Sequence, residues 1–478
     1  MKYDMVIGLE IHSELKTSSK IFCGCKNEFG GEPNTRCCPI CLGIPGTLPV
    51  LNKKVLEYTI KAGLAMQCKI AHFSKFDRKN YFYPDMPKAY QVSQYNLPIC
   101  YDGYVDIEVG DQIKRIGIER IHIEEDAGKL IHCSHEQSSL IDYNRCGVPL
   151  IEIVTRPDLR SPEEARIFLE TVKSILEYTE VSDCKMQEGS LRADVNLSLK
   201  PKGYEALGVR TEMKNINSLR AVERAALAEA ERQTQRLESG QKVYQETRRW
   251  DDNKGESIMM RDKEKAMDYR YFPEPDLTPI RIDDNLTKAI QASIPELPRQ
   301  RRDRYVSQLG IPKYDAALIT LNKTLADFFD RASEICGNPK LVSNWIMTDT
   351  MRRIKEKGEE ILNSSLNGYN FGRILLSLEK GEITHASAIQ VIDVLLETGE
   401  DPINIIKRLA LYVQRDGTLV REAVREVIKE NPKALNDYIS GKEKAMVFLM
   451  GKTMAALQGR GDPFHVKNIL VKELQEYL

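Results

Sequence analysis

The sequence predicts an α+β protein whose N-terminal part is built on antiparallel sheet and whose C-terminal part is all helical. Residues 1 to about 290 alternate polar and apolar side chains in short runs broken by Gly, Pro and Asn, a pattern typical of half-buried strands. Beyond about residue 299 the apolar period changes from two to 3.6, which is the period of amphipathic helices. We therefore expect a sheet domain followed by helical domains.

Length and punctuation predict three domains. The 478 residues suffice for two to four domains of roughly 150 residues each. Pro295 and Pro298 stand before a charged run, and Gly and Pro recur among the short helical patterns that follow Asp401. The expected domains are residues 1–294, with an insertion at about 23–41, then 295–405 and 406–478.

Composition excludes several classes of protein. The chain is 42% hydrophobic with a net charge of −1, as expected of a globular protein with no overall field for nucleic acid or membrane. Only residues 406–478, with thirteen Lys and Arg against nine Asp and Glu, offer a basic excess to a polyanion such as RNA. No apolar run is long enough for a membrane span and no signal peptide is evident, so we expect a cytoplasmic protein.

The first predicted strand covers Val6 to Leu15, where apolar and ionisable residues alternate. The alternation places Glu10, His12 and Glu14 on one face, about 7 Å apart. Such a face either meets solvent or holds a ligand, and this strand alone does not decide between the two.

Five of the eleven cysteines fall between residues 23 and 41. Cys23 pairs with Cys25 and Cys38 with Cys41 across a loop rich in Gly and Pro, the spacing of a zinc ribbon with four thiolates. Four thiolates leave no open ligand position, so the predicted zinc is structural. Cys37 is interpreted as a spare thiol or a neighbour of the ligands. The remaining cysteines are interpreted as packing residues: Cys68, Cys100, Cys133, Cys146, Cys184 and Cys336.

Residues 75–85 mix cations, aromatic rings and carboxylates. The segment suits a pocket wall or a stacking surface for a base, and it suits a strand and turn at a sheet edge equally well.

Two further segments carry carboxylates. Residues 121–129 contain His122, Glu124, Glu125 and Asp126, and Glu152 stands alone within the apolar run 150–154. A lone glutamate in such a run is costly to bury unless it is paired or bound to a metal.

Two helices and two strands complete the sheet domain. Ser161 to Thr179 reads as a helix with Ser161 as N-cap and Pro162 in its first turn, and a second helix runs from Ser218 to about Glu238. The strands alternate strictly, and their polar faces carry Ser190, Arg192, Asp194, Asn196 and Ser198 in the first and Arg210, Glu212 and Lys214 in the second.

Carboxylates with Arg and Lys on one face of a sheet suit Mg²⁺ and a nucleoside triphosphate, because Mg²⁺ prefers oxygen ligands and phosphates prefer cationic donors. The chain contains neither a P-loop motif nor a G-x-G-x-x-G that opens a helix, so P-loop and Rossmann chemistry are not supported.

Five segments together resemble the family of the B subunit of the bacterial tRNA-dependent amidotransferase (GatCAB). They are Ile7–His12 (IGLEIH), Lys75–Asp85 (KFDRKNYFYPD), Ile123–Lys129 (IEEDAGK), Gln187–Asn196 (QEGSLRADVN) and Tyr269–Asp276 (YRYFPEPD). The resemblance runs through the whole chain and includes the tail segment Lys444–Gly451. It implies a cradle domain related to glutamine synthetase and guanido kinases, a helical domain and a tRNA-binding tail.

The resemblance also implies an activity. ATP would phosphorylate the side-chain carboxylate of Glu on tRNA(Gln) or Asp on tRNA(Asn), and ammonia would then displace phosphate. A glutaminase A subunit would supply the ammonia, and a small C subunit would clasp the other two. No membrane partner is expected.

Site residues follow from the same resemblance. It implies a Mg²⁺ cluster at Glu10, His12, Glu125 and Glu152, although strict alternation places Glu124, not Glu125, on the face of His122; a bulge after Glu124 would reconcile the two. The imidazole of His12 also leaves Mn²⁺ open. The candidate contacts to ATP phosphate and substrate are Lys79, Ser190, Arg192, Asp194 and Asn196, with Tyr81 and Tyr83 as pocket walls.

Two other functions compete with this interpretation. One is a small-molecule carboxylate–amine ligase or kinase with the same cradle, which would not need a basic helical tail. The other is a non-enzymatic zinc-ribbon RNA-binding protein, which does not explain three strands that present carboxylates, since carboxylates repel phosphate unless a metal intervenes.

Overall fold

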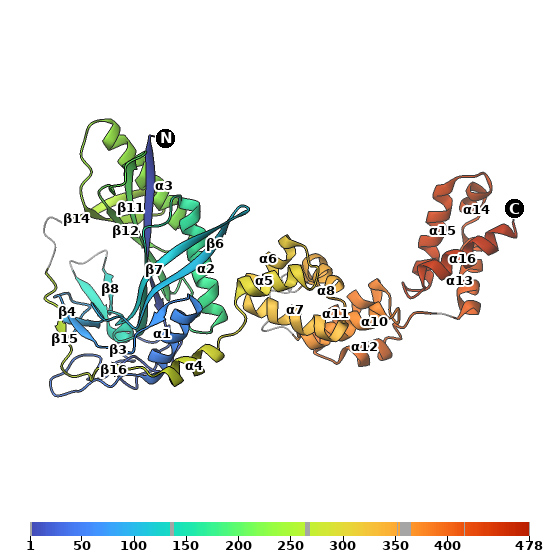
Figure 1. Ribbon diagram of the computed structural model, residues 1–478. Helices are drawn as coiled ribbons and strands as arrows, with labels where there is room; N and C mark the ends of the chain where they lie inside the picture. The colour runs from blue at the N-terminus through green and yellow to red at the C-terminus, as the bar shows by residue number, and fades with distance from the viewer. Residues whose placement is uncertain are drawn as a thin grey trace. The chain divides into compact units, whose positions relative to one another are not determined.

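The computed structural model describes residues 2–133, 138–262, 268–350, 352–353, 365–414 and 416–477. The chain divides into two compact units, residues 1–298 and 299–478, coloured blue to yellow and yellow to red in Figure 1. The division lies close to the boundary expected after residue 294.

A nine-stranded sheet forms the framework of the first unit, in the order β14-β13-β12-β11-β1-β10-β7-β6-β2. Neighbouring strands are antiparallel except β12 and β13, which are parallel. The predicted mixed and largely antiparallel α+β fold is thereby confirmed. The strands are β1 (Tyr3–Glu14), β2 (Lys69–Ile70), β6 (Cys100–Val109), β7 (Gln112–Glu125), β10 (Pro149–Thr155), β11 (Leu191–Pro201), β12 (Thr211–Ile216), β13 (Glu246–Asp251) and β14 (Glu256–Asp262).

Helices cover the apolar face of this sheet. α1 (Lys53–Ala65), α2 (Pro162–Tyr178) and α3 (Leu219–Glu238) pack with the inward residues of β1 and β11 into one core. The side chains of Ser161 and Ser218 accept hydrogen bonds from the N–H groups of Glu164 and Ala221, as expected of N-caps. The polar face that the alternation predicts is therefore the face that these helices leave open.

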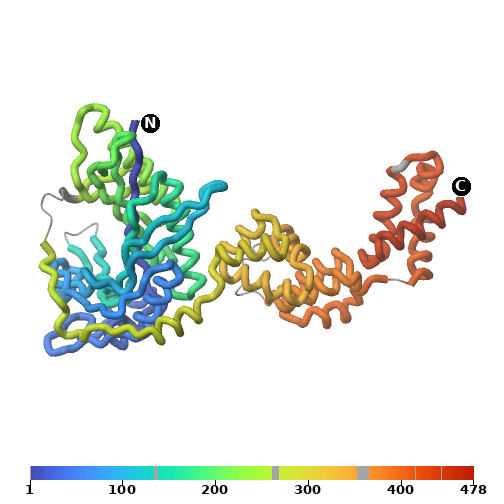
Figure 2. Tube along the Cα trace, viewed as in Figure 1, coloured from blue at the N-terminus to red at the C-terminus, as the bar shows by residue number. Residues whose placement is uncertain are grey.

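Short strands and one helix complete the unit. They are β3 (Phe73–Ser74), β4 (Asp77–Asn80), β5 (Tyr90–Ser93), β8 (Lys129–His132), β9 (Ser139–Asp142), β15 (Phe272–Pro273), β16 (Ile280–Arg281) and α4 (Asp284–Ala292). The last part of the unit runs back along its first part: β15 pairs with β4, β16 pairs with β3, and α4 packs on α1 (Figure 2). Residues near 80 and near 270 therefore meet.

The second unit is helical in its described residues, as the change of period predicts. Its α-helices are α5 (Pro298–Ser307), α6 (Lys313–Thr320), α7 (Lys323–Cys336), α8 (Pro339–Trp345), α10 (Gly368–Glu379), α11 (His385–Thr398), α12 (Pro402–Arg408), α13 (Gly417–Glu430), α14 (Pro432–Ile439), α15 (Glu443–Ala456) and α16 (Pro463–Gln475). The boundary expected after residue 405 falls inside α12, which packs on α10 and α11. Helices α13 to α16 form a separate apolar core. Across the described ranges, no helix is both long and apolar enough to cross a membrane.

Candidate active site and zinc site

Strand register gathers the polar side chains of four strands on the open face. His12 on β1 lies opposite Glu152 on β10, and Glu152 lies opposite His122 on β7. On the other side of β1, Asp194 lies opposite Glu10 and Arg192 lies opposite His12. Side chains opposite one another in a sheet point to the same face, so these residues form one polar surface.

The first cluster on this surface consists of His12, Glu124 and Glu152. Nε2 of His12 lies 3.2 Å from Oε1 of Glu124 and 3.6 Å from Oε2 of Glu152. Nε2 of His122 lies 3.3 Å from the same Oε2 atom. One ligand atom from each of His12, Glu124 and Glu152 falls within 4.8 Å of the others, a spacing that fits a shared metal ion.

The charges of this cluster perturb one another. Burial disfavours the charged form of His12, but the hydrogen bond to Glu124 and the negative charges of Glu124 and Glu152 raise its pKa to about 9. Burial likewise disfavours the charged form of Glu152, but His122, His12 and Lys79 hold its pKa below its usual range. The carboxylates are therefore ionised at neutral pH, as metal binding requires.

Lys79 on β4 faces the same cluster among aromatic rings. Burial opposes its charge, but Glu124 and other nearby anions raise its pKa overall, which keeps it cationic. Its Nζ atom lies 5.0 Å from the ring centre of Tyr269, and that ring meets Tyr81 edge-on at 6.4 Å. The structure thus brings Lys79 and Tyr81 to the site, whereas the Tyr83 side chain lies 54% exposed on the following turn.

A second cluster consists of Glu10, Asp194 and Glu212, whose oxygens also lie within 4.8 Å of one another. The Nζ atom of Lys214 lies 2.5 Å from Oδ2 of Asp194 and 2.9 Å from Oε1 of Glu212. Burial and the charges of Glu152 and Glu212 raise the pKa of Glu10. Asn196 donates from Nδ2 to Oε1 of Glu10 at 3.0 Å, and its buried Oδ1 has no partner among the described atoms.

Two predicted contacts have other partners. Arg192 donates from Nη2 to Oδ2 of Asp126 at 2.7 Å and remains on the polar face. The Ser190 hydroxyl donates to Asp183 at 2.7 Å and accepts from the N–H of Lys185, so it closes the turn before β11. Arg192 therefore remains a candidate substrate contact, and the Ser190 hydroxyl has a structural role.

Glu125 is not brought to the metal cluster. The pairing of β7 with β10 is continuous from Arg120 to Glu125, without the bulge that would turn Glu125 to the face of His12. Its carboxylate is 3% exposed in its side chain, forms an ion pair with Lys88 and accepts the N–H of Val92 at 2.9 Å. The structure therefore corrects the carboxylate that joins His12 and Glu152 from Glu125 to Glu124.

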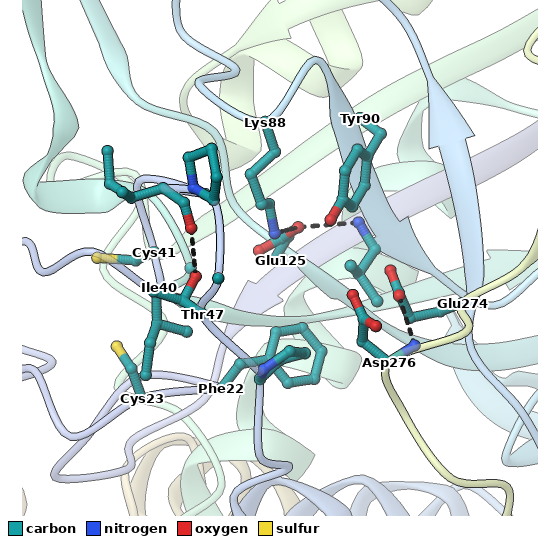
Figure 3. A pocket seen from close by; sticks show the side chains of 17 residues that line it. Phe22, Cys23, Ile40, Cys41, Thr47, Lys88, Tyr90, Glu125, Glu274 and Asp276 are labelled. Atoms are coloured by element: carbon teal, nitrogen blue, oxygen red, sulfur yellow. Dashed lines mark hydrogen bonds and ion pairs between the residues drawn. The ribbon is translucent and has the colours of Figure 1, made fainter.

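Glu125 instead lines a cavity of about 200 Å³ next to the cysteine loop (Figure 3). Lys88, Tyr90 and Glu274 line the same cavity, and Phe22 and Cys41 approach it from the other side. The ion pair of Lys88 with Glu125 is therefore a buried feature of the cavity wall.

Lys88→Met is expected to destabilise the first unit by about 3 kcal/mol, because it leaves the buried Glu125 charge without its partner. Lys69→Met removes the exposed ion pair with Asp102 and is expected to cost less than about 1 kcal/mol. Denaturant unfolding of both variants measures the difference. Equal stability of the two variants would show that the Glu125 charge is compensated elsewhere.

The four predicted zinc ligands converge. The sulfur atoms of Cys23, Cys25, Cys38 and Cys41 lie within 4.8 Å of one another, and those of Cys38 and Cys41 are 3.9 Å apart. A tetrahedral zinc with Zn–S bonds of about 2.3 Å separates its sulfurs by about 3.8 Å, so the donor set fits zinc. Cys37 lies outside this group, and its sulfur contacts the backbone oxygen of Asn34.

A second cavity, of about 210 Å³, lies on the polar face beside Glu10. Backbone and small side chains of three strands line it, including Gly8, Thr155 and Ser198, with Arg210 at one side. Its position next to the second cluster gives the surface room for an organic ligand.

Sequence reasoning noted but did not select several residues of the surface. Glu212 and Lys214 alternate on one strand, yet only the neighbouring position of β12 and β11 brings them to Glu10. Thr247 carried no signal: its hydroxyl donates to Oε2 of Glu212 at 2.9 Å from β13, a strand that was not predicted.

Comparison with known proteins agrees with this architecture. Residues 5–288 match the family model described as the GatB/GatE catalytic domain, and residues 327–474 match the model described as the GatB domain. The B subunit of the aspartyl/glutamyl-tRNA(Asn/Gln) amidotransferase of Caldicellulosiruptor bescii is 57% identical over 479 residues, covering 100% of both chains. The proteins of the same name from Thermoanaerobacter sp. (strain X514) and Carboxydothermus hydrogenoformans are 53% and 50% identical, with 99% or more of each chain covered. The chain therefore belongs to the GatB family, the B subunits of the aspartyl/glutamyl-tRNA(Asn/Gln) amidotransferases.

Proposed function

We propose that this chain uses ATP to activate the side-chain carboxylate of Glu on tRNA(Gln), of Asp on tRNA(Asn), or of both, for amidation by ammonia. The observation that carries the proposal is the pair of carboxylate clusters on the open sheet face, with cationic side chains beside them. Relatives that share half or more of their residues over the full chain are named for this reaction. The site of action would be the cytoplasm, where tRNA is charged and used.

The chemistry explains why such a surface is needed. A carboxylate is a poor electrophile, and phosphorylation converts it to a mixed anhydride whose phosphate leaves when ammonia attacks the carbonyl carbon. The γ-phosphate and the substrate carboxylate are both anions, so the site must offset their repulsion. A bound Mg²⁺ or Mn²⁺ would supply Lewis-acid charge stabilisation.

Residues of the chain have separable parts in this reaction. His12, Glu124 and Glu152 would hold a divalent ion, and Glu10 with Asp194 and Glu212 would hold a second one or orient the first. Lys79, which lies among the anions of the first cluster, would contact the transferred phosphate or the substrate carboxylate. Arg192 and Asn196 would contact the substrate.

ATP would place its nucleoside in the cavity beside Glu10. The cavity adjoins the second cluster, so a nucleoside there would direct its phosphates towards the carboxylates and their metal. The zinc held by the four cysteines would be structural.

Ammonia must come from a partner, because the residues assigned to the site are carboxylates, imidazoles and cations with no glutaminase nucleophile among them. The proposed complex contains a glutaminase A subunit and a small C subunit. A free-standing small-molecule ligase and a non-enzymatic RNA-binding protein remain the outcomes against which the proposal is tested.

The decisive experiment measures ATP hydrolysis and amide formation by the reconstituted complex with charged and uncharged tRNA. We expect both activities to depend on Glu-tRNA(Gln) or Asp-tRNA(Asn). Amidation of a free amino acid without tRNA would favour the small-molecule ligase. Binding of tRNA without any ATP turnover would favour the RNA-binding protein.

Removal of the tail from residue 411 onwards is expected to weaken tRNA binding while ATP binding to the first unit persists. The removed segment contains helices α13 to α16 with their own core, and it carries eleven Lys and Arg against nine Asp and Glu. The cut lies beyond α12, so α12 keeps its packing on α10 and α11. Fluorescence anisotropy with labelled tRNA measures the change, and unaltered tRNA affinity would contradict a binding role for the tail.

A further inference from the structure

Lys20 is a fully buried lysine, with 0% of its surface exposed, three residues before Cys23. Its chain segment leads directly into the first cysteine pair, and its N–H donates to the carbonyl oxygen of Cys25 at 3.0 Å. Burying an ammonium group without a compensating charge is very costly, so buried lysines have anionic partners or lose their proton.

The partner of Lys20 is a cysteine sulfur. Its Nζ atom lies 3.8 Å from Sγ of Cys41, and no carboxylate within the described ranges approaches it to ion-pair distance. The cations nearby differ in this respect: Lys88 pairs with Glu125, and Arg36 pairs with Glu28 at 3.3 Å.

A neutral thiol is a weak acceptor and does not offset the charge of an ammonium, whereas a thiolate does. Four thiolates around one Zn²⁺ carry a net charge of −2, which is also costly to place in a partly buried loop. The two unfavourable charges are of opposite sign and lie side by side.

We infer that Lys20 is the buried counter-ion of a tetrathiolate zinc centre at Cys23, Cys25, Cys38 and Cys41, and that it contacts Cys41. The inference rests on the zinc site proposed above. It assigns to Lys20 a positioning and charge-balancing role: the ammonium stabilises the metal-bound thiolates and thereby slows the loss of zinc.

Lys20→Met keeps the aliphatic stem and removes the charge, so the zinc–thiolate centre is left without its counter-ion. Groups that contact metal ligands change metal affinity by roughly 10- to 100-fold when they are removed, and we expect zinc to be lost faster by a similar factor. Lys20→Arg keeps the charge and should retain zinc more firmly than the Met variant. Lys26→Met is the matched control, because Lys26 is exposed and adjoins Cys25.

The test uses the full chain purified in the presence of zinc. Zinc content is measured first, and the rate of zinc transfer to a chromogenic chelator is then compared among the wild type and the three variants. We expect fast transfer from Lys20→Met and wild-type rates from Lys26→Met. A wild-type chain that holds no zinc would overturn the zinc site itself. One zinc per wild-type chain with equal rates in Lys20→Met and Lys26→Met would overturn only the role of Lys20.

A spectroscopic measurement separates charge balance from loss of packing. In Co²⁺-substituted protein, the thiolate-to-cobalt charge-transfer band should shift to lower energy in Lys20→Met, because the removed ammonium no longer stabilises the thiolate electrons. The band should stay unshifted in Lys26→Met, and an unshifted band in Lys20→Met would overturn the contact. Should Lys20→Met fail to fold, Lys20→Gln is compared with Lys20→Arg by the same two measurements, and equal behaviour of that pair would overturn the inference.

Discussion

Glu124→Gln is expected to reduce ATP-dependent amidation of charged tRNA by about 10²- to 10³-fold, while the fold is retained. The substitution keeps the shape and much of the hydrogen-bonding capacity of the side chain but removes one negative charge beside His12. The remaining ligands then hold the divalent ion less tightly, and repulsion between the γ-phosphate and the substrate carboxylate is less well offset. Amidation by the reconstituted complex measures the effect, and glutamine hydrolysis in the same complex reports that assembly is intact.

Mn²⁺ binding followed by electron paramagnetic resonance adds a readout that does not depend on turnover. Glu124→Gln should lose affinity for Mn²⁺, whereas Glu125→Gln should retain it, because Glu125 pairs with Lys88 away from His12. Glu108→Gln, an exposed change on β6, controls for the loss of a carboxylate. Loss of Mn²⁺ in Glu125→Gln and its retention in Glu124→Gln would reverse the assignment of the ligand.

Replacing both Cys38 and Cys41 by serine is expected to remove about one zinc per chain and to lower the melting temperature of the protein. Structural zinc stabilises small peptides by an apparent free energy of about 10–16 kcal/mol, so the loss of even part of this energy is large for a domain. The loop would lose the link that joins its two ends. Metal analysis and thermal unfolding measure the two effects.

Cys37→Ser is the matched control for the double replacement. Cys37 adjoins Cys38 in the chain, yet its sulfur faces the backbone of Asn34 and not the other four sulfurs. This variant should keep its zinc and its melting temperature. Equal zinc content in the control and the double variant would show that the cysteines do not bind the metal.

Local patterns in the sequence were sufficient for the elements of the sheet domain. Alternation predicted the strands that became β1, β10 and β11, and the serine N-caps predicted the starts of α2 and α3. The zinc set was equally accessible, because two short chelating pairs show their spacing within nineteen residues. In each case the physical cause acts between residues close in the chain.

The case of Glu124 and Glu125 shows where a local argument needed the structure. Alternation favoured Glu124 and the family resemblance favoured Glu125, and a bulge would have reconciled them. The register of β7 with β10 is regular up to Glu125, and its irregularity lies at Val154 and Thr155 instead. A single extra residue in a strand reverses which side chain faces the site, and sequence patterns do not reveal such an insertion.

The sequence by itself determined the types of element, the polar and apolar faces of each strand and the chelating cysteine pairs. Only the tertiary structure decided that residues 12, 122 and 152 meet, that Glu212 and Lys214 join Glu10, and that Lys20 faces Cys41. The reason is that the period of a strand specifies its own two faces, whereas the order of strands in a sheet depends on packing between segments far apart in the chain. The candidate active site lies across β7, β10, β1, β11 and β12, so its composition follows from that order.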